Sequence, residues 1–142
     1  MKTISFSVIL PVRNGGVYIK DCVDSILNQK YKDFNLIILN NNSDDGTTEW
    51  LQTLNDYRVE VYTSTISLSI EENWSRILSL KKNEFITLIG HDDILHPDYL
   101  QEMSQLIIEF PDASLYQTQF HYINPNGKII RHCKNIPQKL YS

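Results

Sequence analysis

Short apolar runs alternate along the chain with segments in which apolar residues recur at helical spacing. The apolar runs occupy residues 6–12, 35–39, 59–63 and 85–90, and the longer helix-period segments occupy residues 17–29 and 70–81. Successive runs begin about 25 residues apart, which is the length of one strand and one crossover helix. Because the runs are apolar on both faces, helices are expected to cover both sides of the sheet. The pattern predicts an α/β fold in which a mostly parallel sheet is doubly wound by right-handed crossovers.

Turn and cap residues refine the elements between these runs. Asp45 and Gly46 are expected to turn the chain, and Thr47 to cap a short helix. In the segment 70–81, the apolar residues expected to face the sheet are Trp74, Ile77 and Leu78.

The last third of the chain follows a different pattern. Pro97 fits the first turn of a helix that runs to about Phe110. Residues 114–123 alternate in polarity and predict a strand, and Asn126-Gly127 between apolar pairs favours a hairpin turn. The predicted fold therefore ends in a β-hairpin.

The composition excludes several classes of protein. The 142 residues fit one domain, and the net charge of -4 without a cluster of Lys and Arg argues against nucleic acid as a partner. No run approaches the ~18 apolar residues of a membrane-spanning helix, so no transmembrane segment is predicted. Cys22 and Cys133 match no metal-ligand spacing, and Cys22 is expected to be a buried, reduced thiol. These features predict a cytoplasmic protein, and peripheral attachment to the inner face of the membrane stays open.

Polar residues collect where the predicted strands end. Such clusters occupy residues 11–16, 40–47 and 90–93, and a weaker one lies at residues 63–67. The carboxyl ends of parallel strands meet at one edge of the sheet, and ligands bind in open α/β sheets beyond that edge. The sequence therefore predicts a ligand site there.

The residue types at this edge exclude some chemistries and favour another. Asn14-Gly15-Gly16 does not supply a dinucleotide-binding turn, and the sequence contains neither a Gly-Lys-Ser/Thr phosphate loop nor a Gly-x-Ser-x-Gly elbow. The adjacent carboxylates of Asp92 and Asp93 are suited to hold Mg²⁺ or Mn²⁺ against a diphosphate. A phosphoacceptor domain also holds Mg²⁺ at strand ends, but it requires its acid pair after the first strand.

Several segments, in consistent order over roughly residues 1–110, resemble family 2 glycosyltransferases of the GT-A fold. The family has Ser-Val-Ile-Ile-Pro-Val-Tyr-Asn where this chain has FSVILPVRN, and its Cys-x-x-Ser-Ile-x-x-Gln helix is matched from Cys22 to Gln29. The remaining matches are an acid-rich loop ending in Asp-Gly-Thr at 45–47, an Asn-Trp-x-Arg segment at 73–76, and the Asp-x-Asp metal motif at 90–93.

This resemblance implies a Rossmann-like, GT-A domain that binds a nucleotide-sugar donor with Mg²⁺ or Mn²⁺. It further implies an inverting glycosyltransferase of hexosyltransferase type, which moves the sugar to a hydroxyl of a saccharide or lipid-linked acceptor. Synthesis of a surface polysaccharide or glycoconjugate is the expected context. The sugar, the nucleobase and the oligomeric state are not predicted.

The resemblance also implies roles for particular residues. The family's loop beneath the nucleotide is matched by Pro11, Val12, Arg13 and Asn14, and its base-binding acid is matched by Asn40. Its segment with an arginine that contacts base or phosphate is matched by Asn73 and Arg76. Its metal motif is matched by His91 and Asp92, and Asp92 matches the metal ligand. The sequence departs from the family where Arg13 replaces Tyr, Asn40 replaces Asp, and Gly90-His91 replaces Asp-Ser. An ordinary surface role stays open for Arg13 and Arg76. Asp93 is expected to accept local hydrogen bonds.

No catalytic residue is identified in this chain. In the family, the carboxylate base that deprotonates the acceptor lies well beyond the metal motif, on elements after the hairpin. Here the last acid is Asp112, next to the predicted helix at 97–110, so the general base is expected beyond Ser142. The expectation is a single nucleotide-diphospho-sugar-binding domain over residues 1–142, truncated at its acceptor-binding part. A non-catalytic nucleotide-sugar-binding module is the alternative.

Overall fold

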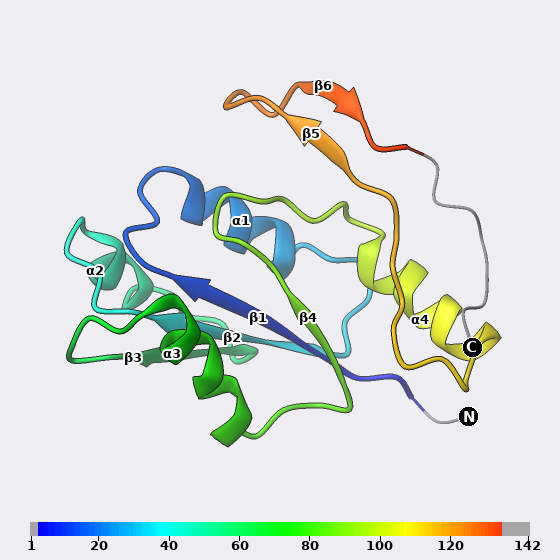
Figure 1. Ribbon diagram of the computed structural model, residues 1–142, viewed down its shortest axis with the longest axis horizontal. Helices are drawn as coiled ribbons and strands as arrows, with labels where there is room; N and C mark the ends of the chain where they lie inside the picture. Colours follow the sequence, from blue (N-terminus) through cyan, green and yellow to red (C-terminus); the bar gives the residue numbers. More distant parts are fainter. Residues whose placement is uncertain (1–2, 135–142) are drawn as a thin grey trace. The chain divides into compact units, whose positions relative to one another are not determined.

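The computed structural model describes residues 3–134, which form two compact units, one reaching Gln101 and one beginning at Glu102. The first unit is built on a four-stranded parallel sheet in the order β3-β2-β1-β4 (Figure 1). Its strands are β1 (Phe6–Val12), β2 (Phe34–Asn40), β3 (Val59–Thr63) and β4 (Phe85–Leu88). The register pairs Val12 with Asn40, and Asn40 with Thr63, so these carboxyl ends are level with one another.

Helices cover both faces of the central strands β1 and β2, as their apolar runs predict, whereas the outer strands β3 and β4 keep exposed residues. The helical elements are α1 (Tyr18–Leu27), α2 (Thr47–Leu51), α3 (Ile70–Ser75), the 3-10 turn η1 (Arg76–Ser79) and α4 (Tyr99–Glu109). The chain moves outward from β1 to β3 and then returns past β1 to β4, so right-handed crossovers place α1 and α3 on opposite faces (Figure 1). Every residue of β1 is buried, because each of its two faces packs against helices.

The face of the α3–η1 segment that meets the sheet differs from the prediction. Ile77 is buried in a cluster with Ile9, Ile37 and Leu39, as expected. Trp74 and Leu78 are 48% and 77% exposed, so their predicted inward orientation is wrong. The buried face is set by Asn73, whose amide donates to the Leu39 carbonyl, and the residue four positions later is Ile77. Trp74 follows Asn73, and Leu78 follows Ile77, by one residue. One residue is a rotation of about 100° around the helix, which turns Trp74 and Leu78 toward solvent.

The second unit contains the rest of α4 and a small antiparallel pair, β5 (His121–Ile123) and β6 (Ile129–His132). The predicted hairpin turn is confirmed: Gly127 has a φ of 73°, and the Asn124 side chain accepts from the backbone N–H groups of Asn126 and Lys128. The strand itself is shorter than the predicted 114–123, because only His121–Ile123 pair with β6. None of the helices within residues 3–134 has the length and apolar character needed to cross a bilayer.

Candidate functional site

The loops after β1 and β2 are joined by hydrogen bonds at the carboxyl edge of the sheet. Three successive backbone N–H groups donate across this junction: Asn14 to Ser43 Oγ (2.9 Å), Gly15 to Thr47 Oγ1 (3.0 Å) and Gly16 to Asp45 Oδ2 (2.9 Å). Asn14 has a φ of 53° and returns a bond through its side chain, which accepts from the Asp44 N–H at 3.0 Å. The predicted polar clusters at 11–16 and 40–47 therefore form one connected surface.

Asp45 and Thr47 hold the start of α2. Asp45 Oδ1 accepts from the Thr47 N–H at 3.0 Å, and hydrogen bonds from Thr47 and from the Gly16 backbone lower the pKa of the Asp45 carboxyl. The predicted cap lies one residue too late, because α2 begins at Thr47 and Gly46 occupies the cap position with a φ of 93°. The Thr47 hydroxyl is instead used to accept the Gly15 N–H.

The residues of the β1 loop differ in accessibility. Pro11 and Val12 are buried at the end of β1, whereas Arg13 and Asn14 are exposed. Arg13 therefore places an exposed positive charge at the edge where the two loops join. The predicted roles of these four residues beneath a nucleotide stay predictions.

Asn40 is completely buried at the end of β2, and its amide is fully engaged. Its Nδ2 donates to Thr48 Oγ1 (2.9 Å) and Thr63 Oγ1 (3.3 Å), and its Oδ1 accepts from the Ser43 hydroxyl (2.7 Å). These bonds join the loops that follow β2 and β3. The predicted contact between Asn40 and a nucleobase stays a prediction, and it would require one of these hydrogen bonds to be exchanged.

Asn73 and Arg76 clamp the same strand ends from the opposite face of the sheet. The Arg76 guanidinium donates to the carbonyls of Asn40 (3.3 Å) and Tyr62 (2.8 Å) and to Asn73 Oδ1 (2.9 Å). Asn73 in turn donates to Leu39 O at 3.0 Å. Arg76 is therefore half-buried and held by the sheet. It is not the solvated surface arginine that the sequence left open as an alternative.

Two carboxylates meet beside Gly90, just after β4. A Cβ atom at Gly90 would lie 3.0 Å from both Asp92 Oδ1 and Asp93 Oδ2, so any larger residue would have to displace them. Both aspartates are exposed, and neither carboxylate has a hydrogen bond or ion pair within residues 3–134. The expectation that Asp93 accepts local hydrogen bonds is wrong, because only its N–H is bonded, to Gly90 O at 3.1 Å. Both acids are therefore available to a cation, and His91 is half-buried between them and Gly90.

Three side chains in and just after helix α1 anchor the loop that carries Asp92 and Asp93, called the acid loop below. The sequence analysis did not assign these side chains to the site. Cys22 Sγ donates to Gly90 O (3.4 Å), and Ser25 Oγ accepts from the Leu95 N–H (3.1 Å). Gln29, which is completely buried, donates to His96 O (2.7 Å) and accepts from the Leu100 N–H (3.0 Å). These are the Cys, Ser and Gln of the helix motif noted above, and the motif itself was the available signal.

The Cys22 thiol is not a candidate nucleophile. Burial, together with the negative charges of Asp93 and Asp92, raises the pKa of Cys22 to about 12. The thiolate is the reactive form of cysteine, so at neutral pH this side chain stays protonated and serves as a hydrogen-bond donor. The predicted buried, reduced thiol is confirmed by its position.

The donor set at this edge fits a hard divalent cation that also binds a phosphate ligand. No cluster of three or more His, Cys, Asp or Glu side chains that could hold a metal alone occurs in the described part of the chain. Mg²⁺ and Mn²⁺ need only one or two protein carboxylates when phosphate oxygens and waters complete the octahedron. Asp92 and Asp93, unpaired and facing one spot, supply that number.

The comparisons agree with this architecture. An enzyme of O-antigen biosynthesis from Escherichia coli, the glycosyltransferase WbnJ, is 33% identical over 134 residues, which are 90% of this chain and 51% of WbnJ. The chain spans between 14% and 51% of the length of the curated relatives that it matches.

Two solved structures show the same fold. TarS 1–349 of S. aureus in complex with UDP-GlcNAc superposes with a TM-score of 0.70 at 21% identity, covering 76% of this chain and 32% of TarS. The mannosyltransferase PcManGT from Pyrobaculum calidifontis, in complex with GDP-Man and Mn²⁺, gives 0.63 at 20% identity, covering 72% and 32%. These similarities confirm the predicted doubly wound, GT-A type of fold.

The model of the family described as glycosyl transferase family 2 matches residues 7–141, which is nearly the whole chain. The match includes the joined loops, the Arg76 clamp and the acid loop described above. The chain belongs to glycosyl transferase family 2.

Proposed function

We propose that this chain is the donor-binding part of an inverting glycosyltransferase. It would transfer a sugar from a nucleoside-diphosphate donor to a hydroxyl of a saccharide or lipid-linked acceptor, in the synthesis of a surface polysaccharide or glycoconjugate. The observation that carries this proposal is the pair of unpaired carboxylates beside Gly90, at the sheet edge where a nucleotide would lie. The family match and the complexes of TarS with UDP-GlcNAc and of PcManGT with GDP-Man and Mn²⁺ support it.

In this proposal the acid loop binds the metal ion, and the loop after β1 contacts the nucleotide. Asp92 and Asp93 would hold Mg²⁺ or Mn²⁺, which when bound offsets the negative charge of a departing nucleoside diphosphate. Arg13 and Asn14 lie exposed on the joined loops and would contact the nucleotide, with Pro11 and Val12 forming the floor beneath them. His91 would contact a phosphate oxygen or a water of the cation.

Three polar residues are proposed to position the nucleotide pocket from behind. Arg76 holds the carbonyls at the ends of β2 and β3, Asn73 holds Arg76, and Asn40 ties the hydroxyls of the flanking loops. Such preorganised hydrogen bonds fix the loops before the ligand arrives, which lowers the entropy lost on binding. Asn40 could also read a base edge by exchanging one of its partners.

A second candidate is a nucleotide-sugar-binding module without turnover. Residues 113–142 contain no Asp or Glu that could act as a general base, and this observation fits either candidate. Both candidates use the same donor site and differ only in chemistry.

One experiment tests donor binding, and another tests whether these residues supply the catalytic base. Calorimetry with UDP, GDP, CDP and TDP, with and without Mn²⁺, should reveal one preferred nucleotide whose affinity Mn²⁺ increases. Absence of binding to any of the four would contradict the proposal. The purified 142-residue chain should then be incubated with the corresponding donor sugar and saccharide acceptors. Transfer would place the base within these residues, and binding without transfer would agree with a base supplied elsewhere or with the module.

A further inference from the structure

The β5–β6 hairpin carries a pocket that the donor site does not use. It has a volume of about 450 Å³ and is lined by Phe120, Tyr122, Arg131, His132, Cys133 and Lys134. All of these belong to the second compact unit. The volume falls in the range of small-molecule sites, about 300–1,000 Å³.

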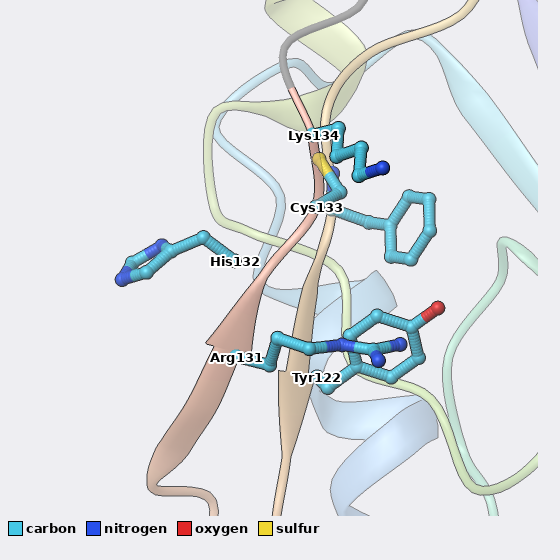
Figure 2. Close-up of a pocket in the computed structure, with 6 residues that line it drawn as sticks. Tyr122, Arg131, His132, Cys133 and Lys134 are labelled. Atoms are coloured by element: carbon cyan, nitrogen blue, oxygen red, sulfur yellow. The ribbon is translucent and has the colours of Figure 1, made fainter.

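The two faces of the hairpin hold different chemistry. Tyr122 pairs with Arg131 across the strands, and His121 pairs with His132 one residue away, so the two pairs point to opposite faces. The two histidines contact each other through Nδ1 atoms 3.1 Å apart. Figure 2 shows Arg131 lying against the Tyr122 ring while His132 points away from both. Arg131 and Lys134 are therefore the cations of the pocket, on a surface formed by two aromatic rings.

The Arg131 guanidinium is held in place but retains its hydrogen-bonding capacity. Its Cζ lies 3.9 Å from the Tyr122 ring centroid, so one flat face of the guanidinium stacks on the ring. Phe120 meets the same ring edge-on at a centroid distance of 5.4 Å, which fixes the platform. Within residues 3–134 the Arg131 side chain makes no hydrogen bond or ion pair, so its N–H groups are available to a ligand. An ordered guanidinium with free N–H groups is suited to bind a carboxylate or phosphate through two parallel hydrogen bonds.

The charge around the pocket is opposite to that of the chain. Overall the chain has 17 Asp and Glu against 13 Lys and Arg, but residues 113–134 contain Lys128, Arg131 and Lys134 and no acid. No carboxylate of this segment can therefore neutralise Arg131 or compete with an anionic ligand. Half-exposed Phe120 and Tyr122 add apolar ring faces, at 49% and 41% exposure, against which a sugar ring can lie.

We propose that this pocket binds a sugar residue that bears an anionic group, a carboxylate or a phosphate, as part of the acceptor. The sugar ring lies against Phe120 and Tyr122, and its anionic group accepts hydrogen bonds from Arg131, with Lys134 adding charge. The assignment of this sugar to the acceptor rests on the proposed function. The pocket itself stands on the contacts of the hairpin.

Three matched probes test the inference: the methyl glycosides of glucose, glucuronic acid and glucose 6-phosphate, which share a ring and differ at C6. Each is titrated into the ¹⁵N-labelled 142-residue chain, with the amide signals of residues 120–134 followed by NMR. The glucuronide or the 6-phosphate is expected to bind roughly tenfold more tightly than the neutral glucoside, the effect of one hydrogen-bonded ion pair. The probe that binds more tightly identifies the anionic group.

Variants assign the effect to the pocket. Arg131→Gln should abolish the preference for the anionic probe, and Tyr122→Leu should weaken all three sugars. Lys128→Gln removes the same charge from the turn of the hairpin, outside the pocket lining, and should change nothing. A native-like spectrum of each variant establishes that it is folded. Equal binding of the three sugars, or a preference that survives Arg131→Gln, would overturn the inference.

A final addition separates this inference from the donor site. UDP with Mn²⁺ is added to the same sample, and paramagnetic broadening is sought at residues 90–93. Broadening there without any response of the hairpin to sugars keeps the proposed function and rejects the pocket. No response at residues 90–93 to any of UDP, GDP, CDP and TDP, each tested with Mn²⁺, rejects the proposed function. Arg131-dependent binding to vesicles containing phosphatidylglycerol, with no binding of sugars, would replace the sugar with a membrane surface.

Discussion

Gln29 is expected to be the residue whose replacement most clearly separates anchoring of the acid loop from contact with a ligand. Its amide donates to Ser25 O (3.1 Å) and His96 O (2.7 Å) and accepts from the Leu100 N–H (3.0 Å). Leu100 lies in the first turn of α4, where backbone N–H groups have no partner within the helix. Gln29 thereby fixes both the end of the acid loop and the start of the following helix.

Gln29→Met preserves the length and shape of the side chain but removes all three bonds. The variant leaves the His96 carbonyl and the Leu100 N–H without their hydrogen bonds to Gln29. Leu100 is completely buried. A buried polar group left unpaired costs about 1–3 kcal/mol, so the free energy of unfolding should fall by about 2–4 kcal/mol. The matched control is Gln52→Met, at an exposed glutamine, which should change stability by less than about 0.5 kcal/mol.

Urea unfolding, followed by the fluorescence of Trp50 and Trp74, measures this difference. Binding of UDP in the presence of Mn²⁺ should also weaken in Gln29→Met, because the carboxylates beside Gly90 would no longer be held in one position. Unchanged stability and unchanged Mn²⁺-dependent binding in this variant would refute the claim that Gln29 anchors the acid loop.

The remaining predictions concern the other buried polar groups. Arg76→Lys keeps the charge but loses the forked contact with Asn40 O and Tyr62 O, and it should lower the free energy of unfolding by about 1–2 kcal/mol in urea titrations. Asn40→Ala removes one hydrogen bond from each of three hydroxyls and should lower the free energy of unfolding by about 2 kcal/mol. Calorimetry with the four nucleotides tests whether the base preference changes as well. Because folding raises the pKa of Cys22 from 9.0 to about 12, its stabilising effect is complete below pH 9.0 and is lost as the pH rises toward 12. The melting temperature of the wild type should accordingly fall more between pH 8 and 11 than that of Cys22→Ala, and equal falls would contradict the raised pKa.

The sheet could be predicted because its signal is local. The runs at 6–12 and 59–63 coincide with β1 and β3, because short apolar runs bounded by turn residues are typical of strands. The proposed position of the site rests on the same reasoning, because parallel strands bring their carboxyl ends to one edge.

The buried polar contacts could not be predicted, because their partners are remote in sequence. Gln29 bonds groups 67 and 71 residues further along the chain. The helix motif that ends at Gln29 marks the residue but does not indicate which groups it bonds. Asn73 is similar: its amide meets a carbonyl 34 residues earlier, and this contact, rather than the apolar pattern, decides which face of α3 is buried. The apolar spacing alone favours Trp74 and Leu78 as inward residues, and it carries no information about this hydrogen bond.

The hydrogen bonding of Asp92 and Asp93 also differs from what the local sequence predicts. A pair of adjacent aspartates predicts a turn, in which one of them accepts backbone hydrogen bonds. In the structure neither carboxylate does so, because the turn at Gly90 is closed by the Asp93 N–H and both side chains face the same spot. The structure thus adds Asp93 to Asp92 as a proposed metal ligand.

The dependence of UDP affinity on Mn²⁺ tests the central claim most directly. Calorimetry should be carried out on the wild type, on the double variant Asp92→Asn/Asp93→Asn, and on Asp24→Asn as a control at an exposed acid of α1. The account predicts that Mn²⁺ tightens UDP binding at least about tenfold in the wild type and the control, and has no effect in the double variant. Because both carboxylates are exposed and unbonded, the double variant should keep its melting temperature. A double variant that retains the full effect of Mn²⁺ would contradict the assignment of the metal to this loop.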